Sequence, residues 1–374
     1  MALAQLNGNV VEHASLLVFY ENFFPAIKHI EGKGVSERYI TDQDPEKVNE
    51  IDVPRILPIK AHARKIGGSS NGGWINTRNA QGGYAPEAVY YTVSLNRVFD
   101  EDVLLPKSLL TSSKLEFKNA VNKIITDSFA QTINAYTWAG QFKKFFEDNT
   151  AVNDAVFVYD GSTTTACQAF QNANASLLNG DMTIGAMTIP SDEKQAFISS
   201  ALDTAMKSQY ATNASNLAAQ INATGFLNPF TQAESKRVDT RTGLLGLYDG
   251  VYLTLFSTPE RSVVYEVLGL TSTDTAEIAI LDKIEGMIVY AGTTVRGVAG
   301  LSLEVNKDPY NNGSFVFAPY AKFGVGVLSG KSIKMIASST ISDADLATVE
   351  DKIAIADVLS SVGDGTSYST QSNR

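Results

Sequence analysis

The feature that most constrains this chain is a long glycine-rich segment between two strand patterns. Residues 63–87 read ARKIGGSSNGGWINTRNAQGGYAPE and contain six glycines and four side-chain amides. Apolar and polar residues alternate before it, over Ile51–Ile66, and after it, over Val89–Asn96. A period of two is typical of a strand with one buried face. Loops of this length are usually functional or disordered, so the segment predicts a long projecting loop with a functional role.

The two strands predict a ribbon that needs support from another surface. Two arms of about 16 residues would extend roughly 50 Å at about 3.3 Å per residue. An isolated two-stranded ribbon is only marginally stable in water, so it must lie on its own domain or on another subunit. Pro54 and Pro58 lack the amide proton that strand pairing uses, which favours an edge strand or irregular pairing.

The tip of this ribbon, residues 67–84, carries the candidate contact residues. A Trp in a loop either folds back onto its own domain or anchors into another protein, for which Trp is well suited. The length and the glycine content of the tip favour the second interpretation. Glycines also let the tip adopt different conformations at little steric cost. The candidate inter-subunit contacts are Trp74, Ile75, Arg78 and Tyr84.

Composition narrows the class of protein. The chain has 374 residues, of which 44% are hydrophobic and 19% charged, and this is typical of a globular protein. Its net charge of −10 argues against general nucleic-acid binding by charge. The single Cys167 excludes an internal disulfide framework and a cysteine-based zinc site. The N-terminus lacks the features of a signal peptide, and no apolar run reaches the length of a membrane helix, so we expect no membrane partner.

Helical periodicity recurs in several places. Ser113 and Glu116 form a capping-box pattern that opens a helix over 113–147, or one that ends near 139 if Gly140 terminates it. The sequence also predicts helices around ACQAFQNANASLL, from Pro190 onward with Phe197, Ile198, Leu202 and Met206 inward, over Glu277–Ile284, and over 342–362. The last residues, 365–374, are polar and small, and we expect them to lack structure.

Strand patterns lie between and after these helices. Asp249-Gly250 predicts a hairpin within Leu244–Phe256. A strand over Met287–Tyr290 follows, and the chain from Val295 to Ile336 is mainly strand, with a hairpin turn at 311–313. Helices and strands mix without regular βαβ alternation, so the predicted fold class is α+β.

Motifs that suggest chemistry occur outside their required context. Gly324–Ser332, GVGVLSGKS, is similar to a phosphate loop, but the glycine that the motif needs is Val325 and the following residues alternate like a strand. Gly68–Gly72 matches the nucleophile-elbow pattern, but no helix follows it. His13, His29 and His62 are isolated from other ligands. We therefore predict no catalytic, cofactor-binding or metal site, and no enzyme.

The order of these parts resembles a known family. Tyr90–Leu110, YYTVSLNRVFDEDVLLPKSLL, resembles a return strand that leads into a long spine helix, and Ile284–Gly292 and Ser314–Ile336 resemble later strands. The family is that of the major capsid proteins of tailed double-stranded-DNA phages, with the Hong Kong 97-like shell fold. The resemblance spans roughly residues 35–340 and rests on the order of the elements and on their local sequence patterns.

The resemblance implies a domain organisation. It consists of an N-terminal arm (1–50), an extended loop (51–106) with its tip at 67–84, a peripheral domain (107–190 and about 292–322) with the spine helix, an axial domain (about 191–291 and 323–340), and a C-terminal helix and tail (341–374).

The implied function is that of a self-assembling subunit, in hexamers and pentamers, of an icosahedral head that encloses double-stranded DNA. The implied partners are other copies of the chain, a separate scaffolding protein, a portal and DNA bound without sequence specificity. Assembly would take place in the host cytoplasm, and the product would be part of the virion. No cofactor is implied.

Two departures and two alternatives accompany this interpretation. About 50 residues precede the extended loop, which leaves no room for a large fused scaffolding segment. The tip has no Lys between Ile66 and Glu87, so it gives no support for covalent cross-linking of the loops. The first alternative is an encapsulin-like nanocompartment shell around protein cargo. The second, from another class, is a β-rich hydrolase or a surface adhesin.

Overall fold

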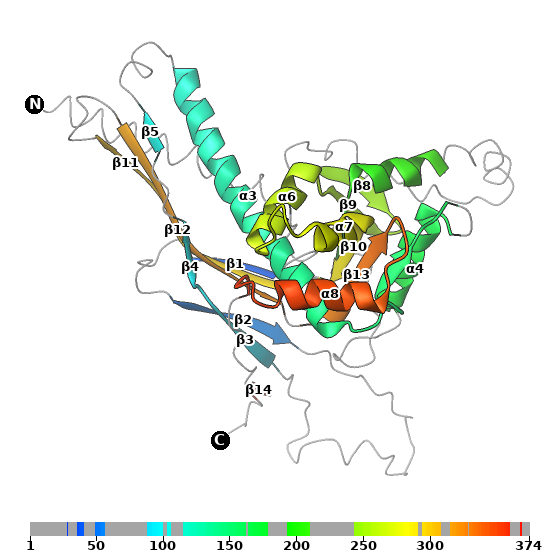
Figure 1. Cartoon of the computed structure of the whole chain (residues 1–374). Coiled ribbons are helices and arrows are strands. Elements are labelled where there is room, and N and C mark those ends of the chain that lie inside the picture. Colours follow the sequence, from blue (N-terminus) through cyan, green and yellow to red (C-terminus); the bar gives the residue numbers. More distant parts are fainter. Residues whose placement is uncertain are drawn as a thin grey trace, which may run out of the picture.

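The fold combines a long helix, two sheets and a projecting ribbon (Figure 1). The computed structural model describes residues 28, 36–40, 49–56, 88–99, 103–105, 115–161, 164–178, 193–209, 243–290, 294–307, 315–327, 329–359 and 367–368. Helices and sheets of mixed strand direction are both present, which confirms the predicted α+β class.

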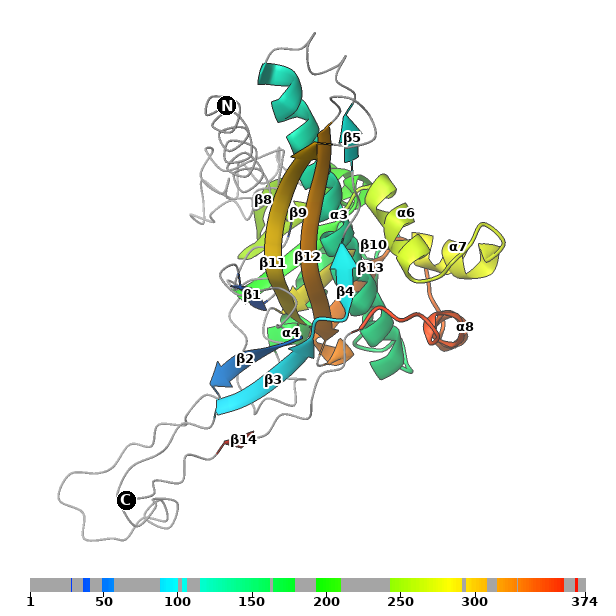
Figure 2. The same ribbon diagram turned by 90° about the vertical axis from the view of Figure 1, so that its left-hand side faces the viewer.

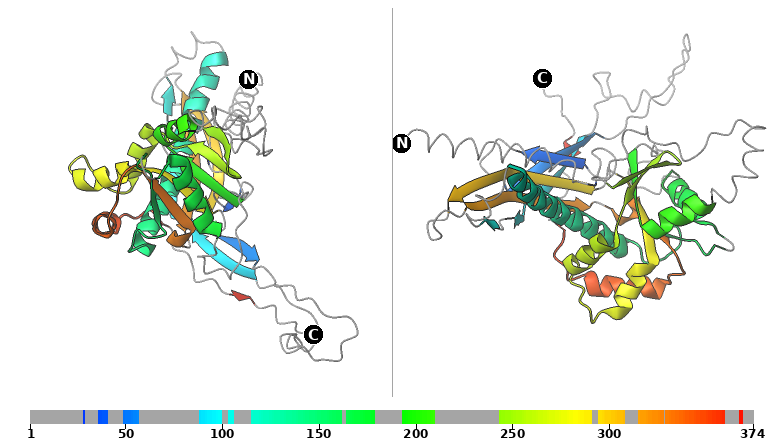
Figure 3. Two further views of the ribbon diagram at one scale, coloured as in Figure 1. Left: turned by 90° about the vertical axis from the view of Figure 1, so that its right-hand side faces the viewer. Right: turned by 90° about the horizontal axis from the view of Figure 1, so that it is seen from above.

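The long helix α3, Leu115–Asp148, runs beside the β11–β12 hairpin and into the body that contains α6, α7 and α8 (Figures 1 and 3). Its C-terminal half is the most apolar, and Trp138, Phe142 and Phe146 are almost completely buried. The sequence left its end open between residues 139 and 147, and the structure shows that it continues through Gly140 to Asp148. Burial of the second half stabilises the helix beyond the weak point that a glycine creates.

A six-stranded sheet forms the larger core. Its strand order is β6-β13-β10-β7-β9-β8, with β10 antiparallel to both of its neighbours and the β6–β13 and β7–β9 pairs parallel. The strands are β6 (Val156–Val158), β7 (Lys194–Ile198), β8 (Leu244–Tyr248), β9 (Val251–Leu255), β10 (Ile284–Tyr290) and β13 (Ile333–Ala337).

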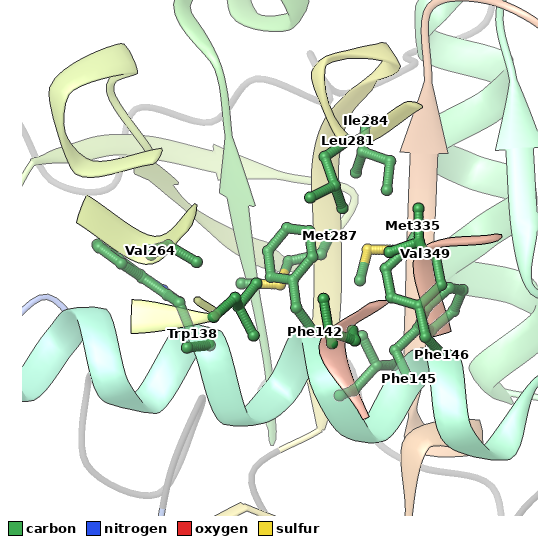
Figure 4. Close-up of a cluster of buried hydrophobic side chains, with 14 of the residues drawn as sticks. Trp138, Phe142, Phe145, Phe146, Val264, Leu281, Ile284, Met287, Met335 and Val349 are labelled. Carbon is green, nitrogen blue, oxygen red and sulfur yellow. The ribbon is translucent and has the colours of Figure 1, made fainter. Parts of the chain in front are cut away.

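Helices cover both faces of this sheet. On one face, the second half of α3 packs with α6 (Thr258–Val267), α7 (Thr275–Lys283) and α8 (Asp343–Ile353) around alternate strand residues such as Met287 and Met335. Figure 4 shows this cluster. On the other face, α4 (Ala166–Leu178) and the helical residues 200–209 pack on Ile288 and Ile336. The sheet is therefore the middle layer of three.

The double cover explains one wrong prediction. The sequence predicted a helix from Pro190 that turns Phe197, Ile198, Leu202 and Met206 inward, but Lys194–Ile198 is strand β7 and the helix includes 200–209. All four side chains are buried, two of them from a strand. When both faces of a strand are covered, its run of buried residues cannot be told from a helix face by periodicity.

The predicted division into domains stays a prediction, and the structure shows only which elements on either side of residue 190 pack together. The sequence assigned residues 107–190 to the peripheral domain and 191–291 to the axial one. Strand β6 and helix α4 lie before residue 190, and β6 pairs with β13 and α4 packs on the six-stranded sheet. Tertiary pairing between distant segments decides such boundaries, and local sequence carries little information about it.

A second sheet is built on a long hairpin. Strands β11 (Thr294–Lys307) and β12 (Phe315–Val327) are antiparallel, as the predicted turn at 311–313 requires, although the turn itself lies outside the described residues. β1 (Ser36–Ile40) pairs with β11 in parallel, and β4 (Arg97–Phe99) and β5 (Val103–Leu105) pair with β12. The hairpin runs beside α3 (Figure 3).

The predicted ribbon forms a third, small sheet. β2 (Glu50–Ile56) and β3 (Ala88–Ser94) are antiparallel, with Ile51 opposite Val93 and Ile56 opposite Ala88. The predicted pairing is confirmed for these residues, and β2 is an edge strand, which accommodates Pro54. β14 (Ser367–Tyr368) adds a third strand along β3, where the sequence predicted no structure.

Local signals account for several element ends. Asp249 and Gly250 have φ angles of 50° and 77° and form the predicted hairpin turn. Ser342 and Asp345 form the predicted capping box of α8, but the helix ends at Ile353 rather than near residue 362. Beyond Ile353 the chain turns to cover α3 instead. Helix α6 was not predicted, although its capping box of Ser257 and Glu260 is visible in the sequence.

We predict that Gly330→Ala destabilises the protein. Gly330 lies in the 3₁₀ turn η4 (Gly330–Ser332), and a methyl group there would overlap the carbonyl group of Lys144 in α3. The expected loss in the free energy of unfolding is about 1–3 kcal/mol, because backbone atoms must move apart. Denaturant unfolding measures it, with Lys331→Ala at the exposed neighbouring position as the control. Equal stability of the two variants would contradict the predicted contact.

Candidate inter-subunit surfaces

The predicted contact residues lie beyond the described part of the ribbon. Trp74, Ile75, Arg78 and Tyr84 belong to the segment 57–87, which is outside the described residues. The structure therefore brings none of them into view, and their role stays a prediction. It does describe the base from which the ribbon leaves the body.

The base of the ribbon rests on strand β11 at a glycine. Ile51 from β2 and Leu95 from the end of β3 are buried and form a small cluster with Ala299. A Cβ atom on Gly297 would lie 2.9 Å from Ile51 Cδ1 and 3.1 Å from Leu95 Cδ2, so the glycine permits this close approach. The amide of Leu95 also donates a hydrogen bond of 2.7 Å to the carbonyl of Asn49, which closes the base.

From this base, the ribbon points away from the body (Figure 2). β2 and β3 leave the second sheet at an angle to the hairpin and carry the chain toward the segment of the tip. The ribbon is therefore anchored at its base and projects from the second sheet.

The hairpin sheet has one covered and one open face. Phe317, Ala321 and Phe323 of β12 are buried, and the Phe323 ring contacts Tyr136 of α3 at 5.4 Å between centroids. The alternate residues, including Val316 and Tyr320, are partly exposed. Because strand residues alternate between faces, these lie on the side of the sheet away from α3.

Two of the most exposed apolar side chains lie on this open face. Val98 is 47% exposed and pairs with Lys322, and Leu104 is 49% exposed and pairs with Val316. Opposite residues in an antiparallel pair point to the same side of the sheet, so both join the open face. We call Val98, Leu104, Val316, Ala318 and Tyr320 the outer patch. Such a patch is suited to contact with another protein surface.

A residue of the predicted N-terminal arm is held by the body. Lys28 forms an ion pair of 2.7 Å with Glu260 of α6, and its Nζ donates a hydrogen bond of 2.9 Å to the carbonyl of Leu255. Its own carbonyl accepts a hydrogen bond of 2.8 Å from Gln195 Nε2. Lys28 thus joins the six-stranded sheet to α6, and at this point the N-terminal chain is part of the folded body.

The phosphate-loop candidate takes a different local structure. Gly324 and Gly326 lie in β12, Gly330 packs against α3, and β13 follows η4 directly. Lys331 is exposed at the surface. The motif requires a helix after the loop so that its backbone amides face a phosphate, and here a strand takes that place.

Within the described ranges, no group of three or more His, Cys, Asp or Glu side chains is arranged to hold a metal ion. The helices in the described part of the chain are all too short or too polar to cross a membrane. Cys167 is half-buried, and burial raises the pKa of its thiol.

Buried cations are the electrostatic feature that the sequence did not predict. Lys194 in β7 is completely buried, and its Nζ donates hydrogen bonds to the Asn174 side-chain oxygen at 2.8 Å and to the Asn174 carbonyl at 3.2 Å. Asn174 Nδ2 in turn donates to Asp249 at 2.7 Å. Desolvation lowers the pKa of Lys194 to about 8, and the Asp249 carboxylate opposes this shift.

Arg296 in β11 is a second buried cation. Its side chain lies between α3 and the hairpin and donates a hydrogen bond of 3.3 Å to Thr137 Oγ1. Desolvation lowers its pKa to about 9. Both cations lie in packed cores and hold elements together there. Their burial depends on covering elements far away in sequence, so no local signal marks them.

Comparison with known proteins gives structural matches alone. No protein-family model matches the chain, and no curated protein matches it in sequence. Solved structures to which it is similar include the head of Helicobacter pylori bacteriophage KHP40 (9% identity, TM-score 0.48, covering 86% of this chain and 90% of that one) and the capsid of Ralstonia phage GP4 (9% identity, TM-score 0.47, 84% and 93%). The mature capsid of bacteriophage PhiM1 matches with 11% identity, a TM-score of 0.43, and 84% and 88% coverage.

These solved chains are phage capsid and head components.

We predict that the free energy of unfolding depends on Lys194 at alkaline pH. Its pKa is about 8 in the folded protein and about 10.5 ordinarily, so below pH 8 both states carry the proton and the full cost of burying the charge is present. Between pH 8 and 10.5 the folded state releases the proton first, and the cost diminishes. Wild type should therefore gain about 2–3 kcal/mol relative to Lys194→Met over this range.

Denaturant unfolding of the two proteins at several pH values measures this gain. Lys331→Met, at an exposed site, is the control and should track wild type. A constant difference between wild type and Lys194→Met from pH 8 to 10.5 would contradict the lowered pKa.

Proposed function

We propose that this chain is a structural subunit of a phage head that assembles with copies of itself into a closed shell. The observation that carries the proposal is the anchored ribbon: β2 and β3 are fixed at Ile51, Leu95 and Gly297 and then lead away from the body. An arm with a rigid base and a projecting end is suited to reach a neighbouring subunit.

The outer patch supplies a surface of the right kind for such an arm. Its apolar side chains lie on the open face of the hairpin sheet. Two of them, Val98 and Leu104, belong to β4 and β5, the strands that follow the ribbon in the chain. When each copy gives an arm and receives one, weak contacts multiply around a ring. Self-assembly through many modest contacts is what a shell subunit requires.

Several finer features belong to this proposal. The assembly would contain hexamers and pentamers, and residues 67–84 would adapt to both through their glycines. The shell would enclose double-stranded DNA, and a net charge of −10 lets DNA pack against it without tight adhesion. A separate scaffolding protein and a portal would assist assembly in the host cytoplasm. The division into peripheral and axial domains on the spine helix α3 is part of the same proposal.

The alternatives differ in what they enclose or bind. An encapsulin-like shell would hold protein cargo, whereas a phage head would protect DNA from nuclease. A β-rich hydrolase or an adhesin would remain a monomer or a small oligomer under the same conditions. Electron microscopy and nuclease protection of the shells therefore separate the three.

We predict that the purified protein forms polyhedral shells, tubes or rings, and that the outer patch is needed for this. Val98→Asp together with Leu104→Asp should abolish assembly, because two buried carboxylates at each contact would lack partners. Val98→Ile together with Leu104→Met keeps the patch apolar and should assemble as wild type does. Negative-stain microscopy reports assembly and circular dichroism reports the fold. A wild-type protein that stays monomeric would contradict the proposed function.

A second prediction concerns the tip. Replacing 67–84 with a two-residue Asn-Gly turn should leave a folded subunit, because the described cores lie elsewhere, and should impair assembly, because the arm no longer reaches its neighbour. Sedimentation measures assembly. A second variant replaces Trp74, Ile75 and Tyr84 alone with Ser and keeps the length of the tip, and it should also impair assembly because the candidate contacts are lost. Normal closed shells in normal yield from the shortened chain would show that the tip is not an assembly arm.

A further inference from the structure

The chain that follows α8 crosses the C-terminal third of helix α3. Lys143 Nζ donates hydrogen bonds to the carbonyls of Ala354 and Ala356, at 2.9 and 2.6 Å. Ala356 and Val358 are buried in the cluster that α3 forms with the six-stranded sheet. These contacts fix residues 354–359, which we call the strap, onto α3 as part of the folded body.

A glycine in α3 makes room for the strap. A Cβ atom at Gly140 would lie 2.9 Å from Leu359 Cδ2 and 3.4 Å from Val325 Cγ1. Gly140 therefore lets the strap settle between α3 and the end of β12. Glycine is unfavourable inside a helix. The close approach of Leu359 explains why a residue without a Cβ atom occupies this position.

The strap leads to the point where the ribbon begins. Asp357 lies 3.5 Å from Arg97, the first residue of β4 and three residues beyond the end of β3. The Arg97 guanidinium stacks over the Tyr136 ring of α3, 4.6 Å from its centroid. Asp357 is largely exposed, so this ion pair orients the two segments more than it stabilises them.

The same C-terminal chain meets the ribbon again at its outer end. In β14, Ser367 pairs with Val89 and Tyr368 with Ala88, where β2 also pairs through Ile56. β3 is thus held by the C-terminal chain near both of its ends. A third strand is what raises a ribbon above the marginal stability of two strands.

We propose that the strap and β14 act as a tether that limits the range of directions of the ribbon relative to the body. One end of the tether is held on α3 at Lys143 and Gly140, and the other pairs with the ribbon at Ala88 and Val89. With the base alone, on Ile51, Leu95 and Gly297, the ribbon has one attachment and can pivot about it. With the tether, it has a second attachment, and its range of directions is narrower.

The test measures the direction of the ribbon in single, unassembled subunits. Spin labels are placed at Thr92→Cys in β3 and Lys207→Cys in the body, in a Cys167→Ser background, and the distance distribution is recorded by pulsed electron spin resonance. The chain that ends after Leu359 keeps the strap and lacks β14. The matched control ends after Tyr368 and keeps both.

The expected result is a narrow distribution in the full chain and in the control, and a distribution at least twice as broad after truncation at Leu359. Circular dichroism and melting temperature should be equal in all three, since every buried residue of the strap is retained. Equal widths for all three chains, or a broad distribution already in the full chain, would overturn the proposal.

Hydrogen exchange gives a second measurement on proteins of full length. Ser367→Pro together with Tyr368→Pro removes the β14 amides, and the amides of residues 88–90 should then exchange about tenfold faster, on the scale of one backbone hydrogen bond. Gln371→Pro together with Ser372→Pro is the control and should leave exchange unchanged. Unchanged exchange in the first variant would show that β14 does not support β3. Both tests are independent of assembly, so they fail or succeed separately from the proposed function.

Discussion

The burial of the second half of α3 is the interaction on which the rest of the structure depends. Trp138 packs on Phe197 and Phe256, with ring centroids 5.6 and 4.6 Å apart, and Phe142, Phe145 and Phe146 continue the same stripe (Figure 4). Aromatic side chains of this size contribute most of the apolar area of a core. The six-stranded sheet and helices α6, α7 and α8 are all arranged around this one stripe.

Because α3 is long, one helix serves two packing units. Its buried half belongs to the larger core, while Tyr136 and Thr137 already contact Phe323 and Arg296 of the hairpin sheet. The hairpin therefore packs on the same helix as the larger core, and the base of the ribbon packs on the hairpin. The larger core and the hairpin sheet are therefore both positioned by packing on α3.

Small residues at a few close approaches complete this arrangement. Gly330 admits η4 against the backbone of α3, Gly140 admits Leu359, and Gly297 admits the base of the ribbon. At each, two segments distant in sequence approach closely, through backbone atoms at Gly330 and through apolar side chains at Gly140 and Gly297. From the sequence alone, such glycines suggest loops, helix ends or phosphate-binding motifs. Their neighbours in space show that they allow close packing between segments.

The sequence by itself determined the elements whose pattern is local. The alternation predicts the ribbon, which the structure confirms for β2 and β3. Asp249-Gly250 specifies a turn, and Ser342 with Asp345 specifies the start of α8, because steric preference and capping act within a few residues. The tertiary structure decided the rest: that Lys194–Ile198 is a strand, that Lys194 and Arg296 are buried, that β6 joins β13, and that the C-terminal chain returns to β3. These outcomes depend on which distant segment covers a given face, and that choice is made by the packing of the whole chain.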